Sequence, residues 1–544
     1  MIRDTEALWL RPNVVAEPLV NQWYAWPYLI SPMTAPLYVS NLQMRILESF
    51  VAAPGEHGAA VADPARAAGP FLDCDPSRVG EVRDLIERTR RRQGRLLAFA
   101  DAAARLGELL GAEGRGESLV PLYALVPDEL RGYVELVYDV ASRPAVRFLE
   151  GLLYQSPYYD DSVQAISLSL AHVDGRGFVF STPRLPDDEH FQIDLPLRER
   201  GLDALFGMRE APLPFGELRE SLALGEREGA ALARFLTDEA PAAREPWTRD
   251  ETRVRYFGHA CVLVETRGFS ILVDPVVSAT PDSGIQRFTY EDLPETVDVV
   301  AVTQARQDHC MLETLLELRR KARHVVVPKS GGSPADPSLK LALRALGFPS
   351  VVELDEMESL ALPSGSVTSV PCLGGHGDLD VRGKSAYLVR SGGRSIFLAG
   401  DSSAVAPELY GHLHALFGDL DVAFVGMEHD GPTLSWLYGP LLPEPLPARA
   451  EASRLLDGAD ARRALALVER LKPAAVYVYA MGAEPWLRSF ASEETREPRE
   501  AELFVAACAG RGVPAELLFG RREIVVGADG VEAAETAEPL EVAR

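Results

Sequence analysis

The sequence has few cysteines and no long apolar run. Its five cysteines among 544 residues are scattered, odd in number and without a Cys-x-x-Cys pair, which predicts reduced thiols rather than a disulfide framework. No uninterrupted apolar stretch approaches the ~18 residues of a membrane-spanning helix. The first residues also lack the basic and apolar segments of a signal peptide. We therefore expect a soluble, cytoplasmic protein that makes no contact with a membrane.

The sequence also has fewer basic than acidic residues. The chain has 55 Lys and Arg against 80 Asp and Glu, a net charge of −25. A surface of that sign repels phosphate backbones and anionic lipids, which argues against nucleic-acid and membrane binding. Common nucleophile and nucleotide motifs are missing too, because Gly400–Ser403 is not a Gly-x-Ser-x-Gly elbow and no glycine-rich phosphate loop follows a predicted strand.

The length of the chain predicts two or three domains. The pattern of apolar and turn-forming residues changes about midway along the chain. Residues 1–245 alternate between helical and strand patterns, including a predicted hairpin over 162–182 and one long helical region over 77–110. Residues 250–526 form short apolar strands broken by Gly, Asp and Pro, in two β-rich halves flanked by helices. This order predicts an α+β domain followed by a four-layer αββα sandwich, with an acidic, flexible tail over 527–544.

Polar residues follow several of the predicted strands in the second domain. They occur in Phe257–Ala260, Ile271–Pro275, Asp308–His309, Pro371–Asp378 and Ala399–Ser402. In this order and spacing the segments resemble the metallo-β-lactamase fold, over roughly residues 250 to 525. The resemblance implies that these loops converge at one edge of the sandwich and form a cleft for metal ions.

Other segments resemble one branch of that superfamily. They are Leu10–Pro27, Ser435–Pro440 and Tyr479–Trp486, and the branch is the diiron β-hydroxylases typified by the enzyme of chloramphenicol biosynthesis. The resemblance implies oxygenase chemistry with a carboxylate-bridged diiron cluster. It also implies an amino-acid substrate tethered to the carrier domain of a nonribosomal peptide synthetase, and a homodimer formed through the first domain.

The segment Thr303–His309, Thr-Gln-Ala-Arg-Gln-Asp-His, stands where the superfamily carries His-x-His-x-Asp-His. The resemblance gives Asp308 and His309 as ligands of one metal and Asp401 as the bridging carboxylate. The two earlier histidines are replaced by Gln304 and Arg306. Gln304 is a weak neutral ligand at best, and Arg306 has no lone pair to offer and adds a fixed positive charge.

Further ligands of the resembled cluster are also missing. Gly375 stands where the oxygenase branch is expected to carry a carboxylate, although the neighbouring His376 could compensate. Tyr479 stands where hydrolase members often supply a last imidazole, and no histidine follows His429. We therefore do not expect an intact dinuclear site.

Two interpretations of the remaining residues follow. In the first, one iron ion binds through Asp308, His309 and Asp401 as a mononuclear Fe(II) site. His376 is a possible further ligand of that ion, and the weaker candidates are Gln304, Glu428 and His429. In the second, which the fixed charge favours slightly, Arg306 pairs with Asp401 or Asp308 and replaces the metal, so that no cofactor is bound.

These interpretations correspond to different functions. The first is an iron-dependent oxygenase, and the second is an inactive paralogue that binds a related substrate, a carrier domain or a partner subunit. A zinc-dependent hydrolase is a further alternative that suffers from the same missing histidines. Trp436, Tyr438 and Trp486 are candidates for a substrate channel, although aromatic residues near strand ends more often serve packing, and His259 is expected to be structural.

Overall fold

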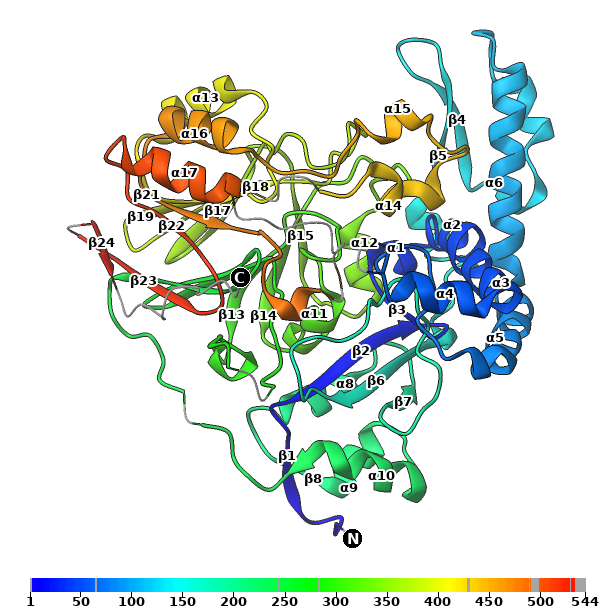
Figure 1. Ribbon diagram of the computed structural model, residues 1–544, viewed down its shortest axis with the longest axis horizontal. Coiled ribbons are helices and arrows are strands. Elements are labelled where there is room, and N and C mark those ends of the chain that lie inside the picture. The colour runs from blue at the N-terminus through cyan, green and yellow to red at the C-terminus, as the bar shows by residue number, and fades with distance from the viewer. Residues whose placement is uncertain are drawn as a thin grey trace.

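The computed structural model describes residues 2–63, 66–242, 244–281, 284–427, 431–488, 490, 499–528 and 530–533 (Figure 1). From residue 252 onward the chain forms two packed sheets. The strands of the first, in spatial order, are β15 (Val351–Leu354), β14 (Ala322–Pro328), β13 (Val297–Ala301), β12 (Phe269–Val273), β11 (Cys261–Thr266), β10 (Thr252–Gly258), β23 (Arg522–Gly527) and β24 (Gly530–Ala533). Those of the second are β16 (Ser359–Leu362), β17 (Gly365–Val370), β18 (Ala386–Ser391), β19 (Arg394–Leu398), β20 (Leu420–Gly426), β21 (Pro473–Tyr479) and β22 (Ala515–Leu517).

Helices cover the outer faces of both sheets, as Figure 1 shows. The second sheet packs against α13 (Pro407–Phe417), α16 (Ala461–Leu471) and α17 (Arg499–Ala509). The first packs against α11 (Leu312–Leu318), α12 (Leu339–Ala345) and the N-terminal half of the chain. A third apolar core lies between the two sheets. The predicted αββα sandwich is confirmed.

Helix α16 illustrates how the sequence specifies these layers. The Asp460 side chain caps its start by accepting a hydrogen bond from the Arg463 backbone N–H at 2.7 Å. The helix ends at Leu471, its C-cap residue Lys472 has a left-handed φ of 53°, and a proline follows. Its buried residues recur at helical spacing: Ala464, Leu467, Val468 and Leu471. One apolar face therefore lies on the sheet and the charged face points outward.

The N-terminal half of the chain combines helices with small sheets. Its strands form three small sheets: β3 (Trp23–Tyr24), β2 (Val14–Val20), β6 (Gln164–Leu170) and β7 (Phe191–Asp194); β8 (Leu213–Pro214), β1 (Ala7–Leu10) and β9 (Leu236–Thr237); and β4 (Val134–Tyr138) with β5 (Pro144–Phe148). Its α-helices are α1 (Pro27–Ile30), α2 (Ala35–Tyr38), α3 (Met44–Ala52), α4 (Pro54–Val61), α5 (Val79–Arg92), α6 (Gly94–Glu113), α7 (Glu150–Leu153), α8 (Arg200–Gly207), α9 (Phe215–Ser221) and α10 (Glu226–Leu232). None of the helices in the described part of the chain is long and apolar enough to cross a bilayer.

One local prediction was wrong, and the structure adds detail to two others. The hairpin over 162–182 does not form, because β6 pairs instead with β2 and β7. The long helical region predicted over 77–110 is confirmed, and it consists of two α-helices, α5 and α6, separated at Gln93. The tail predicted to be flexible from residue 527 begins with β24, which pairs with β23; residues 534–544 lie outside the described part.

A buried ion-pair network joins the two halves of the chain. Glu17 in β2 accepts hydrogen bonds from Arg184 and from Arg176 Nη1, the latter at 2.7 Å. Arg176 Nη2 in turn donates to Glu313 in α11 at 2.8 Å. Burial raises the pKa of Glu17, but the guanidinium groups of Arg184 and Arg176 outweigh burial and lower that pKa to about 2.

This low pKa predicts an acid-sensitive contribution to stability. Because the folded-state pKa lies below the ordinary value of 4.5, the Glu17 carboxylate stabilises the fold above that value and loses this effect as the pH falls toward 2. Glu17→Gln is therefore expected to lower the free energy of unfolding by about 3 kcal/mol at neutral pH and by much less near pH ~3. Urea titrations at the two pH values measure this, with the exposed Glu239→Gln as control. An equal loss at both pH values contradicts the assignment.

Candidate functional site

The candidate site lies where strands of the two sheets end. Because β12 and β13 run parallel, as do β19, β20 and β21, the loops that follow them gather at one edge of the sandwich. The loop after β13 is held by Asp274, which follows β12. Asp274 accepts hydrogen bonds from the Thr303 N–H and Oγ1, both at 2.7 Å, and its Oδ2 lies 2.7 Å from His309 Nδ1. These contacts fix both ends of the Thr303–His309 segment.

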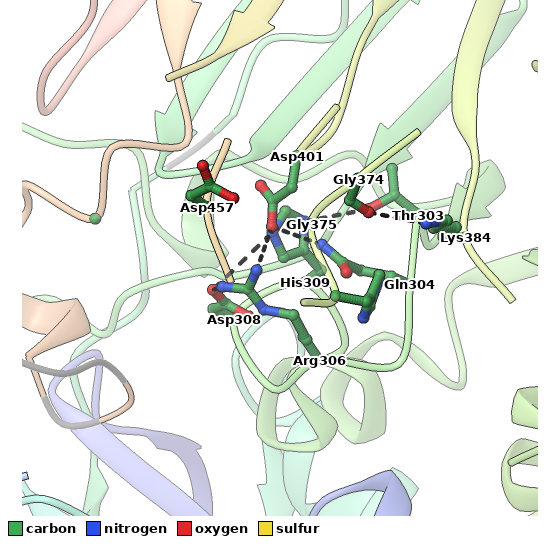
Figure 2. A network of polar contacts seen from close by, with 12 residues as sticks. Thr303, Gln304, Arg306, Asp308, His309, Gly374, Gly375, Lys384, Asp401 and Asp457 are labelled. Atoms are coloured by element: carbon green, nitrogen blue, oxygen red, sulfur yellow. Dashed lines mark hydrogen bonds and ion pairs between the residues drawn. The ribbon is translucent and has the colours of Figure 1, made fainter. Parts of the chain in front are cut away.

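Arg306 lies between two buried carboxylates, as Figure 2 shows. Its Nη1 donates to Asp401 Oδ2 at 2.7 Å, and its Nη2 donates to Asp308 Oδ2 at 2.8 Å. Gln304 Nε2 also donates to Asp401 Oδ2 at 2.7 Å, and His309 Nε2 lies 3.0 Å from the same oxygen. One oxygen of Asp401 thus contacts the side chains at positions 304, 306 and 309. The structure contains both pairings that the sequence suggested as alternatives for Arg306.

The ionisation of the cluster follows from these contacts. Burial raises the pKa of Asp308, but Arg306 and His309 outweigh burial and hold it well below its ordinary value. Burial also raises the pKa of Asp401, but His309 and Arg306 outweigh burial, so that this pKa lies well below its ordinary value. Burial lowers the pKa of His309, while Asp401, Asp274 and Asp308 raise it well above the ordinary value. The structure therefore holds charged carboxylates against charged donors.

His259 is brought into the cluster, although the sequence suggested only a structural role. Its Nδ1 accepts a hydrogen bond from the Gly482 N–H at 3.2 Å, and its Nε2 lies 3.5 Å from Asp308 Oδ2. One potential ligand atom from each of His259, Asp308 and His309 lies within 4.8 Å of the others. Among the described residues, His259 Nε2 and Asp308 Oδ1 have no hydrogen-bond partner.

His376 and Gly375 lie in the loop after β17. His376 Nδ1 lies 2.6 Å from the Tyr438 hydroxyl, so this imidazole is engaged outside the carboxylate cluster. Burial, followed by Lys384 and Arg306, lowers the pKa of His376 well below its ordinary value. Gly375 has a φ of 77°, and a Cβ added there would lie 3.2 Å from the Asp401 backbone oxygen. A carboxylate at position 375 would therefore project toward Asp401.

The aromatic candidates have different surroundings. Trp436 lines a small apolar cavity, and Trp486 lines a larger one of mixed polar and apolar lining at the boundary between the two halves of the chain. Tyr438 is fully buried and contacts His376. The weak candidates Glu428 and His429 lie outside the described residues.

Asp274 was missed as a site residue, although the sequence contained a signal for it. It directly follows the uniformly buried strand β12, in the segment Leu-Val-Asp-Pro. A fully buried carboxylate needs hydrogen-bond donors, and the Thr303 hydroxyl and the His309 imidazole are the side chains that meet it. The pairing of Tyr479 with the Gly400 N–H, at 2.8 Å, had no comparable signal.

Both halves of the chain match families of known proteins. The diiron non-heme β-hydroxylase N-terminal domain matches residues 9–241, and the β-lactamase superfamily domain matches residues 253–477. The chain is 39% identical over 534 residues to the 4-amino-L-phenylalanyl-[CmlP-peptidyl-carrier-protein] 3-hydroxylase of Streptomyces venezuelae, covering 95% of this chain and 99% of that protein. The chain belongs to the diiron β-hydroxylase family.

Solved structures of this family agree over almost the whole chain. The crystal structure of CmlA, a diiron β-hydroxylase from Streptomyces venezuelae, has a TM-score of 0.88 at 36% identity. A mutant of the CmlA β-hydroxylase has a TM-score of 0.87. Each comparison covers 95% of this chain and 99% of the other. The family resemblance inferred from the sequence is thereby confirmed.

Proposed function

We propose that this chain is a metal-free member of its family that binds an aminoacyl group carried on a peptidyl carrier protein without hydroxylating it. The observation that supports this most directly is the position of Arg306. Its guanidinium contacts Asp401 and Asp308, the carboxylates expected to bind metal, at 2.7 and 2.8 Å. A guanidinium cannot bind a metal ion, and its charge opposes a second cation at the same place.

The surrounding residues do not fit a dinuclear iron centre. Gln304 replaces one expected imidazole and donates to Asp401, while Gly375 provides no side chain beside that carboxylate. The two buried carboxylates instead form ion pairs with Arg306 and His309. The fold can thus retain its cleft without the cluster.

The proposal of a carrier-bound substrate comes from the similarity to the Streptomyces venezuelae hydroxylase. The Streptomyces venezuelae protein is named for a 4-amino-L-phenylalanyl group on the CmlP peptidyl carrier protein, and the likeness includes the entire N-terminal domain. A hydrolase function does not explain that domain. We further propose that the chain acts in the cytoplasm as a homodimer.

A second candidate, a mononuclear iron oxygenase, is favoured by one observation. His259, Asp308 and His309 present ligand atoms within 4.8 Å of one another, and each of these three side chains has a buried atom that makes no hydrogen bond in the described structure. These residues, with Asp401 if Arg306 moved aside, would hold one Fe(II), which in such a site activates O2.

Metal content and carrier binding test the proposal together. We expect the purified chain to contain substoichiometric iron by mass spectrometry, before and after anaerobic Fe(II) addition and desalting. We also expect it to bind the CmlP carrier domain charged with 4-aminophenylalanine more tightly than the same domain lacking its phosphopantetheine arm, without forming a hydroxylated product. If the chain retains two irons, Arg306 does not exclude the metal cluster as proposed. If it retains one iron and forms a hydroxylated product, the chain is the mononuclear oxygenase. If the two carrier domains bind equally tightly, the chain does not recognise the aminoacyl group.

A further inference from the structure

A separate cavity lies within the N-terminal half of the chain. Its volume is about 460 Å³, within the range of small-molecule sites, and none of the candidate site residues lines it. The apolar part of its lining is buried and consists of Val20, Leu29, Ile30, Val39 and Val163. The cavity therefore offers a ligand an apolar wall that is distinct from the carboxylate cluster.

Three of the four charged residues in the lining are arginines. Arg91 and Arg92 end α5, Arg95 lies in the first turn of α6, and Asp160 is the acidic residue. All three arginine side chains are exposed, and they form no ion pair with the described part of the chain. The Asp160 carboxylate already accepts a hydrogen bond from the Ser162 N–H at 3.0 Å. In a chain of net charge −25, this local excess of positive charge favours an anionic ligand.

The start of α6, the long helix in Figure 1, also belongs to the lining. This helix runs for 20 residues from Gly94, and no side chain caps its first turn. The first N–H groups of a helix have no partner within it and carry partial positive charge. A Cβ added at Gly94 would meet no atom within 4 Å. The helix start therefore leaves room for an anion beside the arginines.

Two buried glutamines of the lining have polar atoms to spare. Gln93 is 4% exposed, and its Oε1 accepts a hydrogen bond from Asn21 Nδ2 at 3.1 Å, which leaves Nε2 without a partner among the described residues. Gln43 is 5% exposed, and its side-chain amide makes no hydrogen bond within the described part of the chain. These free amide atoms are not fully enclosed, so a molecule in the cavity can contact them.

The helical segment that carries Gln43 is irregular. One π-helical turn, Val39–Gln43, joins α2 to α3, and the Met44 N–H donates to the Val39 oxygen across five residues. Both ends of this turn line the cavity. π-helical turns are rare and occur frequently at functional sites. The turn is thus independent support for a binding role of this wall.

We propose that this cavity binds a small molecule that bears a phosphate group. The phosphate lies at the start of α6 and contacts Arg91, Arg92 and Arg95, because a phosphate supplies the charge and the acceptors that both features favour. The body of the ligand lies against the apolar wall. A glutamine amide both donates and accepts, so an amide or hydroxyl of that body bonds to Gln43. The inference does not rest on the proposed function.

Calorimetric titration of the full chain with 4′-phosphopantetheine, pantetheine and inorganic phosphate tests the site. The first two probes differ only in the phosphate, and their shared body carries methyl and amide groups. We expect 4′-phosphopantetheine to bind at least about tenfold more tightly than pantetheine, as one charge-assisted contact allows. Inorganic phosphate should bind more weakly than 4′-phosphopantetheine and compete with it.

The double variant Arg91→Gln with Arg95→Gln tests the phosphate contacts. We expect it to lower the affinity for 4′-phosphopantetheine about tenfold and so to abolish the preference over pantetheine. Arg83→Gln with Arg88→Gln is the matched control, since it makes the same change in net charge on α5 at two positions outside the lining. The control should keep both affinities within about twofold of the wild-type values.

The variant Gln43→Met tests the contact with the body of the ligand. It keeps a long unbranched side chain, so we expect it to weaken 4′-phosphopantetheine and pantetheine by a similar factor, about fivefold, and to leave inorganic phosphate unchanged. Because the Gln43 amide has no partner in the described structure, the urea midpoint of unfolding should not fall.

The inference is overturned if the phosphate group brings no gain in affinity for the wild-type chain, or if the control double variant loses as much affinity as the cavity variant. The wild-type comparison decides even if a variant fails to fold. The cavity variant also identifies the source of the ligand. If it weakens binding of a carrier domain bearing its phosphopantetheine arm, that arm is the occupant, and if carrier binding is unchanged, the occupant is a free phosphate ester.

Discussion

Replacing Arg306 with methionine is expected to lower the free energy of unfolding by about 3–5 kcal/mol in the presence of a chelator. The guanidinium contacts both Asp401 and Asp308, so its removal takes a charge partner from each of two buried carboxylates. Urea unfolding at neutral pH measures the loss. Added Fe(II) should restore part of it, because Asp308, His309 and Asp401 are then available to a cation.

A surface arginine provides the matched control. Arg147 pairs with Glu135, but both side chains are about half exposed, at 59% and 45%. Arg147→Met should therefore cost no more than about 1 kcal/mol. If the two substitutions cost the same, the Arg306 ion pairs do not hold the cluster together in the way proposed.

The double substitution Gln304→His with Arg306→His is expected to convert the chain from one that retains no iron to one that retains at least one Fe(II). It restores two imidazoles and removes the fixed positive charge, while Asp401 remains in contact with both positions. Iron content after anaerobic loading and desalting measures the gain.

The control for this gain keeps the positive charge. Gln304→Asn with Arg306→Lys alters the same two positions without adding an imidazole, and it should retain no iron. If the histidine variant also fails to retain iron, the lost imidazoles are not what limits metal binding. Position 375 then becomes the next to restore, because a side chain there projects toward Asp401.

The sandwich could be predicted because its strands are short apolar runs bounded by Gly, Asp and Pro. An uninterrupted apolar run correctly predicts a strand that is buried on both faces, as in β11 and β12. It failed over residues 162–182, where β6 pairs with distant strands and Phe178 and Phe180 supply walls of a pocket. Sequence alternation identifies a strand but not its partner, which is set by contacts far along the chain.

The site could be predicted only as a set of residue types at strand ends. Spacing alone could not show that Arg306 contacts both carboxylates, because Asp401 lies in a loop that follows a strand of the other sheet. It could not assign His376 to Tyr438, which is 62 residues away, or bring His259 to Asp308. These pairings depend on how the loops fold over the edge of the sandwich.

The contacts of Asp274 with Thr303 and His309 hold the site loop without help from positions 304 or 306. In the genetic code, both glutamine codons and two of the arginine codons lie one base from a histidine codon. A loop anchored in this way can exchange imidazoles for an amide and a guanidinium through two point mutations while its backbone support persists. Loss and recovery of metal chemistry in this family are then steps that selection can take in either direction, without rebuilding the fold.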